Sequence, residues 1–447
     1  MPDRDDDLAR GLRDYYQRVA QQPAPDVTGR VMMSADNRAA LRRRWTAICG
    51  GIAGVAAVAA VIVVALVNHN TAPVSAPAQT GAPTNGTTPV PGPSTSPTPL
   101  VRTAPPPPLP PGGPVPPGFT GVSATFTSPY QGWVLGTAPC AKRPCTSILR
   151  TVDGGATWKG VPAPRIELAG SAPFGIIRFA DPLDGWVAAG AQLQVTHDGG
   201  ATWYAAALPG VQASGVISDL ETSAGVVDAW AIRETASAGP SMPATLYHAS
   251  TTQDSWSTAP GVATTNGGYG QLSLVGSHGW LVVGSTHVYS TSDGTTWTAR
   301  SSPCPAQQPV GIAAANASTV YASCTVNGSA GGSMVTRTMK VSHDGGASFQ
   351  STSPPPQTGD FSGIAATPNG RTVALAVSTA GPGSIQLSND GGAHWKTPYS
   401  ADQTGGAGFA DLGFTTDSQG VVVLAPGQSG VLFLSHDGGL SWRAVRF

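Results

Sequence analysis

The sequence predicts an all-β protein, a seven-bladed β-propeller of four-stranded blades preceded by one transmembrane helix and a Pro-rich disordered stalk. Three observations support this fold class. An Asp-Gly-Gly turn signature recurs at intervals of 39 to 56 residues, a second apolar signature alternates with it, and one uncharged stretch is long enough to span a bilayer. Only 11% of the 447 residues are charged, while 57 are Gly and 41 are Pro, which disfavours a mostly helical protein.

Residues 1–44 are expected to form a small cytoplasmic tail with a short helix, because apolar residues from Leu8 to Val19 fall at helical spacing before Pro23. A docking helix and a marginal juxtamembrane helix are both compatible with this pattern. The tail contains no Cys, so it carries no Cys/His zinc site of the kind found in some membrane-anchored regulators.

Residues 45–67 form an uncharged stretch of 23 residues, and a helix of this length spans the hydrocarbon core of a bilayer. A cleaved signal peptide is the alternative, but the stretch is longer than a signal-peptide core and 44 residues precede it. Four Arg residues lie just before the stretch, and no Lys or Arg follows until Arg102. The positive-inside rule therefore predicts a single-pass cell-membrane protein with a cytoplasmic N-terminus.

Residues 68–118 are predicted to be an extracytoplasmic linker that lacks a core of its own. Between Thr71 and Gly118, 17 of 48 residues are Pro, including the run Pro105–Pro108. Such a composition favours extended polyproline II structure, so we expect a spacer between the membrane and the following domain.

Residues 119–447 contain the repeat. Five full copies of the first signature read like Thr-His-Asp-Gly-Gly-Ala-Thr-Trp at Thr196–Trp203, one copy at Thr291–Trp297 is shortened, and one at Thr251–Trp256 is decayed. Their Asp residues are Asp153, Asp198, Asp254, Asp293, Asp344, Asp390 and Asp437. Seven units of 40 to 50 residues match the period of a propeller blade.

The second signature is a short apolar strand, often opened by Gly-Trp as at Gly132–Leu135. Together the two signatures divide each unit into four short antiparallel strands, which in the second unit are Gly175–Ala180, Gly185–Ala189, Gln192–Thr196 and Thr202–Ala206. The first unit begins with its innermost strand near Gly121–Thr127, and the last ends with its outermost strand near Trp442–Phe447. We therefore expect the ring to close without strand exchange, with a one-strand shift at the seam as the alternative.

The turn signature has a structural explanation in each copy. Gly accepts positive φ, the Asp carboxylate accepts bonds from turn N–H groups, and the following aromatic residue is a large body that can pack between sheets. Calcium or catalytic chemistry would need several acids together, whereas each unit supplies one. The residues assigned this structural role are Asp153, Asp198, Asp293, Asp344, Asp390 and Asp437, with Trp158, Trp203, Trp297, Phe349, Trp395 and Trp442.

The pattern Ser/Thr-x-Asp-Gly-Gly-x-Thr-Trp resembles the Asp box, or bacterial neuraminidase repeat. Such boxes occur in sialidases, sortilin-type receptors, some glucan hydrolases and photosystem II assembly-factor propellers. The resemblance covers about residues 119–447 and implies that the boxes lie at the outer edge of each blade, far from an active site. Because the fold is shared by proteins of different function, the resemblance does not select one.

The sialidase template implies three Arg residues, a Tyr–Glu pair, an Asp acid/base and an Arg-Ile-Pro motif, and the last is missing from this sequence. A two-carboxylate glycosidase needs two acids close together. Four acids lie in or beside expected innermost strands, and we expect them to be exposed loop acids rather than channel residues: Asp219, Glu221, Asp360 and Asp411. Arg178 is compatible with either a channel position or a structural role. We therefore assign no catalytic residues.

Cysteine and histidine positions indicate structure rather than chemistry. Four Cys follow the expected membrane span, and sequential pairing predicts the disulfides Cys140–Cys145 and Cys304–Cys324. The histidines His197, His343 and His436 occupy the variable position of turn signatures, so we expect exposed turn residues. No cofactor and no metal site is expected.

The function predicted from the sequence is that of a membrane-anchored extracytoplasmic propeller acting as a non-catalytic binding or assembly module. Its partner would be an extracytoplasmic protein or glycan. The alternative is a sialidase-like glycoside hydrolase acting on surface glycans. A net charge of −1 gives no electrostatic reason to expect a nucleic-acid partner.

Overall fold

The computed structural model describes residues 108–141, 144–168, 175–233, 243–264, 268–284, 287–305, 310–326, 336–356, 360–378, 383–400, 408–424, 431–445 and 447. The expected cytoplasmic tail, the transmembrane helix and most of the linker lie outside these residues. Within the described part of the chain, no helix has the length and apolar character needed to cross a bilayer.

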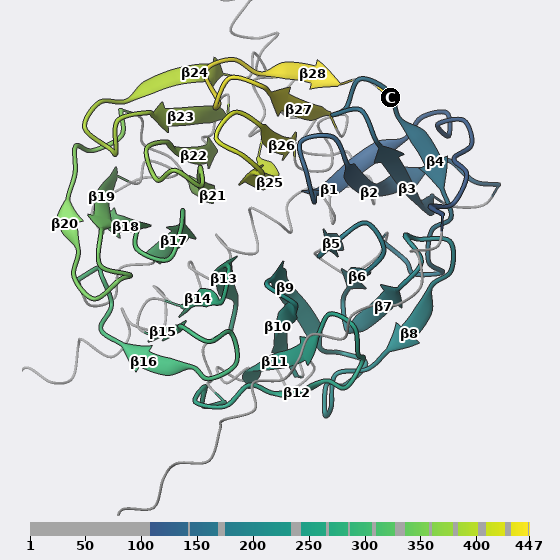
Figure 1. Cartoon of the computed structure of the whole chain (residues 1–447), viewed down its shortest axis with the longest axis horizontal. Helices are drawn as coiled ribbons and strands as arrows, with labels where there is room; N and C mark the ends of the chain where they lie inside the picture. Colours follow the sequence, from purple (N-terminus) through teal and green to yellow (C-terminus); the bar gives the residue numbers. More distant parts are fainter. Residues whose placement is uncertain are drawn as a thin grey trace, which may run out of the picture. The chain divides into compact units, whose positions relative to one another are not determined.

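Within these ranges, seven four-stranded antiparallel sheets form the seven blades of a propeller (Figure 1). Blades 1 to 4 comprise β1 Thr120–Phe126, β2 Gly132–Ala138, β3 Cys145–Thr151, β4 Lys159–Val161; β5 Gly175–Phe179, β6 Gly185–Ala189, β7 Gln192–Thr196, β8 Tyr204–Ala206; β9 Val216–Ser223, β10 Val226–Ile232, β11 Ala244–Ser250, β12 Ser257–Thr258; and β13 Gly270–Val275, β14 His278–Val283, β15 His287–Thr291, β16 Thr298–Arg300.

Blades 5 to 7 follow the same order of strands, with the first strand innermost and the fourth at the rim (Figure 1). They comprise β17 Val310–Ala314, β18 Val320–Val326, β19 Thr336–Ser342, β20 Gln350–Ser351; β21 Asp360–Ala366, β22 Val373–Ser378, β23 Ser384–Ser388, β24 Lys396–Ser400; and β25 Phe409–Phe414, β26 Gly420–Leu424, β27 Leu432–Ser435, β28 Arg443–Val445. The predicted all-β, seven-bladed fold class is therefore confirmed.

Every blade is one continuous segment of chain, so the ring closes without strand exchange, as expected. The innermost strand of each blade lies beside that of the next, and β25 and β26 of blade 7 lie beside β1 of blade 1. At this seam the ring of Phe447 packs edge-on against Phe119 and Trp158, with centroids 5.0 and 5.6 Å apart.

The hydrophobic core is divided into seven clusters, one at each junction between neighbouring blades. At the junction of blades 1 and 2, for example, the buried ring of Trp133 stacks on Phe179 with centroids 3.9 Å apart. Because the apolar residues of each sheet face the sheets beside it, most of the exposed polar groups lie at the axis, the rim and the two faces, although a few polar residues such as Asp228 are buried within a blade.

Candidate functional site

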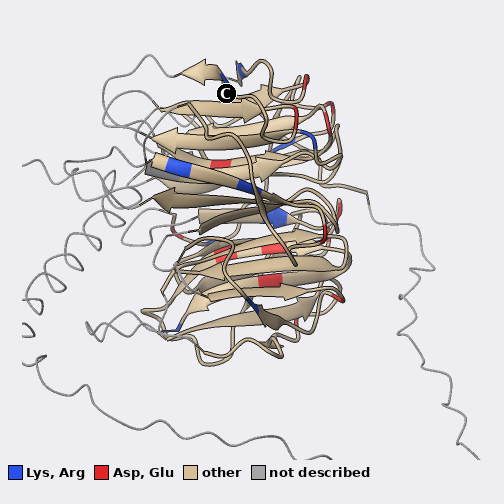
Figure 2. Ribbon diagram, turned by 90° about the vertical axis from the view of Figure 1, so that its left-hand side faces the viewer, with Lys and Arg blue, Asp and Glu red and all other residues tan. Residues whose placement is uncertain are grey.

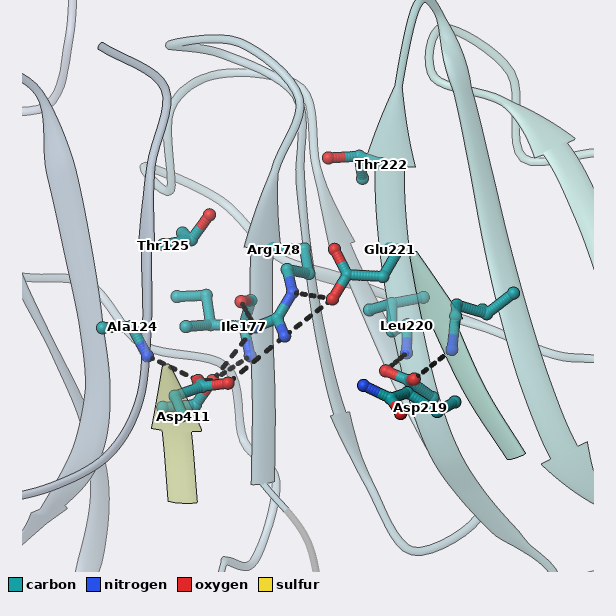
Figure 3. Close-up of polar contacts among 12 residues, drawn as sticks. Ala124, Thr125, Ile177, Arg178, Asp219, Leu220, Glu221, Thr222 and Asp411 are labelled. Carbon is teal, nitrogen blue, oxygen red and sulfur yellow. Dashed lines mark hydrogen bonds and ion pairs between the residues drawn. The ribbon is translucent and has the colours of Figure 1, made fainter. Parts of the chain in front are cut away.

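The strongest concentration of charge inside the ring lies at the axis, around Arg178 on β5. Figure 3 shows its guanidinium pointing between Glu221 of β9 and Asp411 of β25. Nε and Nη2 of Arg178 both donate to Glu221 Oε1, at 3.0 and 2.9 Å, and Nη2 also lies 3.3 Å from Asp411 Oδ1. One cation from blade 2 therefore joins carboxylates of blades 3 and 7.

Blade 1 completes this axial network, which we define as Ser123, Arg178, Asp219, Glu221 and Asp411. Arg178 Nη1 donates to the carbonyl of Ile177 at 2.9 Å and lies 3.3 Å from Ser123 Oγ. The hydroxyl of Ser123 in turn donates to Asp411 Oδ2 at 2.6 Å. Every nitrogen of the Arg178 guanidinium is thus engaged by protein acceptors.

The fifth member, Asp219, extends the network to blade 4. Its Oδ1 accepts the N–H of Leu220 at 2.9 Å, and its Oδ2 accepts the N–H of Leu272 at 2.7 Å. Burial, reinforced by repulsion from Glu221, raises the pKa of Asp219 to about 7. A carboxyl with this pKa is partly protonated at neutral pH, which is the state required of a general acid.

The pKa values of Arg178 and Glu221 are also shifted, by burial on one side and by the attraction of opposite charges on the other. Burial disfavours the charged guanidinium of Arg178, but attraction to Glu221 and Asp411 outweighs it and raises its pKa. Burial also raises the pKa of Glu221, against the opposing attraction of Arg178. The side chains of Arg178, Glu221 and Asp411 are 16, 28 and 18% exposed, so a little solvent still reaches them.

Hydrogen bonds from side chains to the backbone of the neighbouring blade explain why polar residues occupy the innermost strands. These strands have a sheet partner on one side only, and a side chain from one blade accepts an N–H from the innermost strand of the next. Such bonds, donor first, are Ala124 N to Asp411 Oδ2 at 3.0 Å, Ile177 N to Ser123 Oγ at 3.2 Å, Leu272 N to Asp219 Oδ2 at 2.7 Å, Ile312 N to Gln271 Oε1 at 3.2 Å and Ala314 N to Ser273 Oγ at 2.8 Å. The axial polar residues therefore connect the blades.

The expectation that the acids near these strands are exposed loop residues is wrong for three of them. Asp219, Glu221 and Asp411 all lie within innermost strands and are only partly exposed. Asp360 opens β21, but its side chain lies outside the described residues. The missed signal was local: in Asp219-Leu220-Glu221 two acids flank a buried Leu, as expected for a strand whose alternate residues point to opposite faces.

The residues of the turn signature are brought together at the turn between the third and fourth strand of each blade. In blade 2, Asp198 Oδ1 accepts bonds from Thr196 Oγ1 at 2.8 Å and from Thr202 N at 2.9 Å, and Oδ2 accepts Thr202 Oγ1 at 2.6 Å. Gly199 and Gly200 have φ of 74° and 88°, which only Gly adopts without strain.

Similar hydrogen bonds occur at the other five Asp residues assigned to the signature, and in some copies a Ser hydroxyl or the ring of His394 takes the place of a Thr hydroxyl. Asp293, in the shortened copy, accepts the N–H groups of Thr295 and Thr296. These hydrogen bonds hold the pKa of Asp293, Asp344 and Asp390 well below the usual carboxyl range. Figure 2 shows acidic residues gathered on the side of the ring where these turns lie. Because each carboxylate is committed to its own turn, the set does not form one site.

The aromatic residues of the signature are less buried than those of the Gly-Trp strands. Of the six assigned aromatics, Trp297 is 2% exposed, whereas Trp158, Trp203, Phe349, Trp395 and Trp442 are half-buried. Trp133, Trp186 and Trp230 of the second strands are at most 1% exposed. The main wedge between blades is therefore supplied by the second signature.

The decayed signature at Asp254 has acquired a contact with the neighbouring blade. Asp254 Oδ2 accepts the hydroxyl of Tyr204 at 2.7 Å and lies 3.4 Å from Nε2 of His197, whose Nδ1 is 2.6 Å from buried Asp184. The hydrogen bond with Asp184 raises the pKa of His197. His343 and His436 are exposed as expected, but His197 is half-buried and paired, so that expectation is wrong for it.

Both predicted disulfides, Cys140–Cys145 and Cys304–Cys324, are present, with Cα atoms 5.7 and 5.4 Å apart. Cys140–Cys145 closes the connection between β2 and β3, whereas Cys304–Cys324 joins the connection between β16 and β17 to strand β18. Among the residues that the structure describes, no group of three or more His, Cys, Asp or Glu side chains is arranged to hold a metal ion.

Comparison with known proteins supports the fold. No protein-family model matches the chain. None of the curated proteins matches it either. Among solved structures, a puromycin-hydrolysing peptidase of Mycobacterium tuberculosis is 13% identical, covers 75% of this chain and 56% of its own, and has a TM-score of 0.50. An oligogalacturonate lyase in complex with manganese is 11% identical, covers 71% and 89%, and has the same TM-score of 0.50. YCF48 bound to a D1 peptide is 18% identical, covers 72% and 94%, and has a TM-score of 0.48. At these identities the likeness concerns the propeller fold alone.

Proposed function

We propose that this protein is a membrane-anchored extracytoplasmic propeller that acts as a non-catalytic binding or assembly module. The observation that carries the proposal is the closed axial network, in which Arg178 spends all its donors on Ser123, Glu221, Asp411 and a backbone carbonyl. A group that must bind a substrate anion needs donors that are free before the substrate arrives.

The composition of the innermost strands supports the same conclusion. Across these seven strands Arg178 is the one Arg, and none of them contains Tyr or His. The sialidase-like template implies three Arg residues and a Tyr nucleophile, and the seven described innermost strands do not contain that set. The Asp boxes cannot replace it because their carboxylates cap their own turns.

The expected partner is an extracytoplasmic protein or glycan. The span at residues 45–67 and the Pro-rich stalk support presentation at the cell surface. Protease treatment of intact cells tests this part: proteolysis should remove the propeller and leave the tail protected. Equal protection of the propeller in intact and permeabilised cells would contradict the proposed orientation.

The non-catalytic part is tested with the full-length protein in detergent and a panel of surface polysaccharides and aryl glycosides. We expect retention of one partner class without release of reducing ends or unsaturated products. The matched control is Glu221→Gln, which keeps the shape of an axial side chain but removes its charge. Product release by the wild-type protein that disappears in this variant would overturn the proposal.

One observation favours the alternative of a glycoside hydrolase. Asp219, with a pKa of about 7, and Glu221, held by Arg178, lie two residues apart on β9. Two neighbouring carboxyls, one of them with a pKa near neutrality, are the kind of residue pair that acid/base catalysis uses. If hydrolysis is found, its rate should fall as pH rises through 7 and be abolished in Asp219→Asn.

A further inference from the structure

The ring has a segment attached outside its 28 described strands. Residues Pro108–Gly118, here called the clasp, cross the outer edge of blade 1 before β1 begins. Gly113 donates its N–H to the carbonyl of Gly160 at 2.8 Å and accepts the N–H of Gly160 at 3.0 Å. Since Gly160 lies in β4, the clasp pairs with the exposed edge of the outermost strand.

A buried cation lies under the clasp. Arg150 at the end of β3 is 9% exposed, and its Nη2 donates to the carbonyl of Pro110 at 2.8 Å. Its Nη1 is buried without a hydrogen-bond partner, and Arg150 forms no ion pair with Asp or Glu, within the part of the chain that the structure describes. A buried guanidinium without a carboxylate depends on carbonyl oxygens to compensate its lost hydration.

The two ends of the clasp contact the blades on either side. Leu109 lies against the turn of blade 2, where a Cβ placed on Gly199 would come within 2.6 Å of Leu109 Cδ2. Val115 packs against the cluster of blades 1 and 7 that includes Phe119 and Phe447. The clasp therefore contacts blades 1 and 2 and packs against the cluster that blades 1 and 7 share at the seam.

We infer that Arg150, the edge of β4 at Gly160 and the turn at Gly199 form a binding site for an extended Pro-rich peptide, and that the chain's own clasp occupies it and holds the ring closed. A Pro-rich strand suits this site because it offers carbonyl acceptors while bringing few N–H groups of its own. With no strand exchange across the seam, closure rests on side-chain packing, on the hydrogen bonds of Asp411 and Gln419 to blade 1, and on this bound segment. The inference is independent of the proposed function, because it concerns attachment within the ring.

Two neighbouring glycines of the clasp provide a matched test. A Cβ on Gly112 would lie 2.4 Å from Lys159 Cβ, whereas a Cβ on Gly113 meets nothing within 4 Å. Gly112→Ala should therefore lift the clasp and Gly113→Ala should not. The readout in the full-length protein is hydrogen exchange of peptides covering β4, because the Gly160 N–H is bonded to Gly113.

We expect exchange at Gly160 to accelerate at least about 10-fold in Gly112→Ala and to stay unchanged in Gly113→Ala, with a fall of about 5 °C in Tm for the first variant alone. A synthetic peptide of residues 108–118, added in trans, should restore the protection of Gly112→Ala, and the same peptide carrying Ala at position 112 should not. If Gly112→Ala does not fold, Leu109→Ala is the alternative variant, because it weakens the contact of the clasp with the turn at Gly199 without introducing a clash. Equal exchange in both glycine variants, or no effect of the peptide, would overturn the inference.

Discussion

Asp198 at the rim and Asp411 at the axis both accept several hydrogen bonds, but from very different parts of the chain. The partners of Asp198 are Thr196 and Thr202, two and four residues away. The partners of Asp411 include Ser123 and Arg178, 288 and 233 residues away. The rim aspartates thus stabilise turns inside one blade, whereas the axial aspartates hold different blades together. Substitution of a rim residue should therefore destabilise one turn only, whereas substitution of an interior residue should lower the stability of the whole ring.

The largest difference between interior and rim is expected for two tryptophans. Trp133 is fully buried and stacked on Phe179 of the next blade, whereas Trp203 is half-buried. Trp133→Ala should lower the free energy of unfolding by about 3–5 kcal/mol because it leaves a cavity between two sheets. Trp203→Ala should cost less than half of that. Urea unfolding of both variants followed by circular dichroism measures the difference, and equal losses would show that the wedge is shared.

The next largest effect tests the axial network directly. Arg178→Met should cost about 3 kcal/mol, because it leaves the carboxylates of Glu221 and Asp411 without their cation while little solvent reaches them. Arg443→Met, at an exposed position of β28, is the matched control and should change stability by less than about 0.5 kcal/mol. Indistinguishable denaturation midpoints for the two variants would mean that the axis does not couple the blades.

The pH dependence of stability should have opposite signs for Asp219 at the axis and for the turn aspartates at the rim. Asp219 has a raised pKa of about 7 in the folded protein, so the folded state binds more protons and stability falls as pH rises from 4 to 7. The pKa values of Asp293, Asp344 and Asp390 are depressed, so their contribution is present above pH 4 and is lost as pH falls further.

Stability should therefore peak between about pH 4 and 5 and decline by about 1–2 kcal/mol on the neutral side. The pKa of His197 is raised in the folded protein, so its protonated form stabilises the fold below the ordinary His pKa. This contribution is lost as pH rises through the raised pKa, which adds to the same decline. Thermal unfolding across pH 3–8 checks the profile. In Asp219→Asn the decline between pH 4 and 7 should shrink while the loss below pH 4 remains; an unchanged slope would remove Asp219 from the explanation.

The smallest effects are expected within the rim itself. Asp198→Ala should cost about 1 kcal/mol, because the N–H groups it releases are near solvent. Asp254→Ala should cost less, since its partners Tyr204 and His197 keep access to water. Tyr204→Phe should be combined with each Asp variant in turn. The losses of stability should be non-additive with Asp254→Ala and additive with Asp198→Ala. The reverse pattern would contradict the assignment of Asp254 to the contact between blades 2 and 3.

The difference between contacts within one blade and contacts between distant blades also explains which features the sequence could predict. The seven blades were predictable because the Asp-Gly-Gly turn and the Gly-Trp strand are local patterns that repeat, and the sequential disulfides link Cys residues close in the chain. The axial network occurs once, and its members come from blades far apart in sequence, so Arg178 and Asp411 share no pattern that marks them as partners. Composition likewise assigned residues up to Gly118 to the linker, because Pro-rich sequence does not reveal that Pro110 meets a buried Arg150.

The closure of the ring without strand exchange has a consequence for how such a chain changes over generations. Each blade is encoded by one uninterrupted stretch of sequence, so a duplication or deletion of one stretch adds or removes a complete sheet and breaks no strand pair. A blade such as the fifth, whose described residues contribute no carboxylate to the axial network, is the kind of unit most free to be copied. Blades 7, 1, 2 and 3 are linked by Asp411, Ser123, Arg178 and Glu221, so copying one of them alone would duplicate one side of a contact without its partner, and inheritance should keep them together.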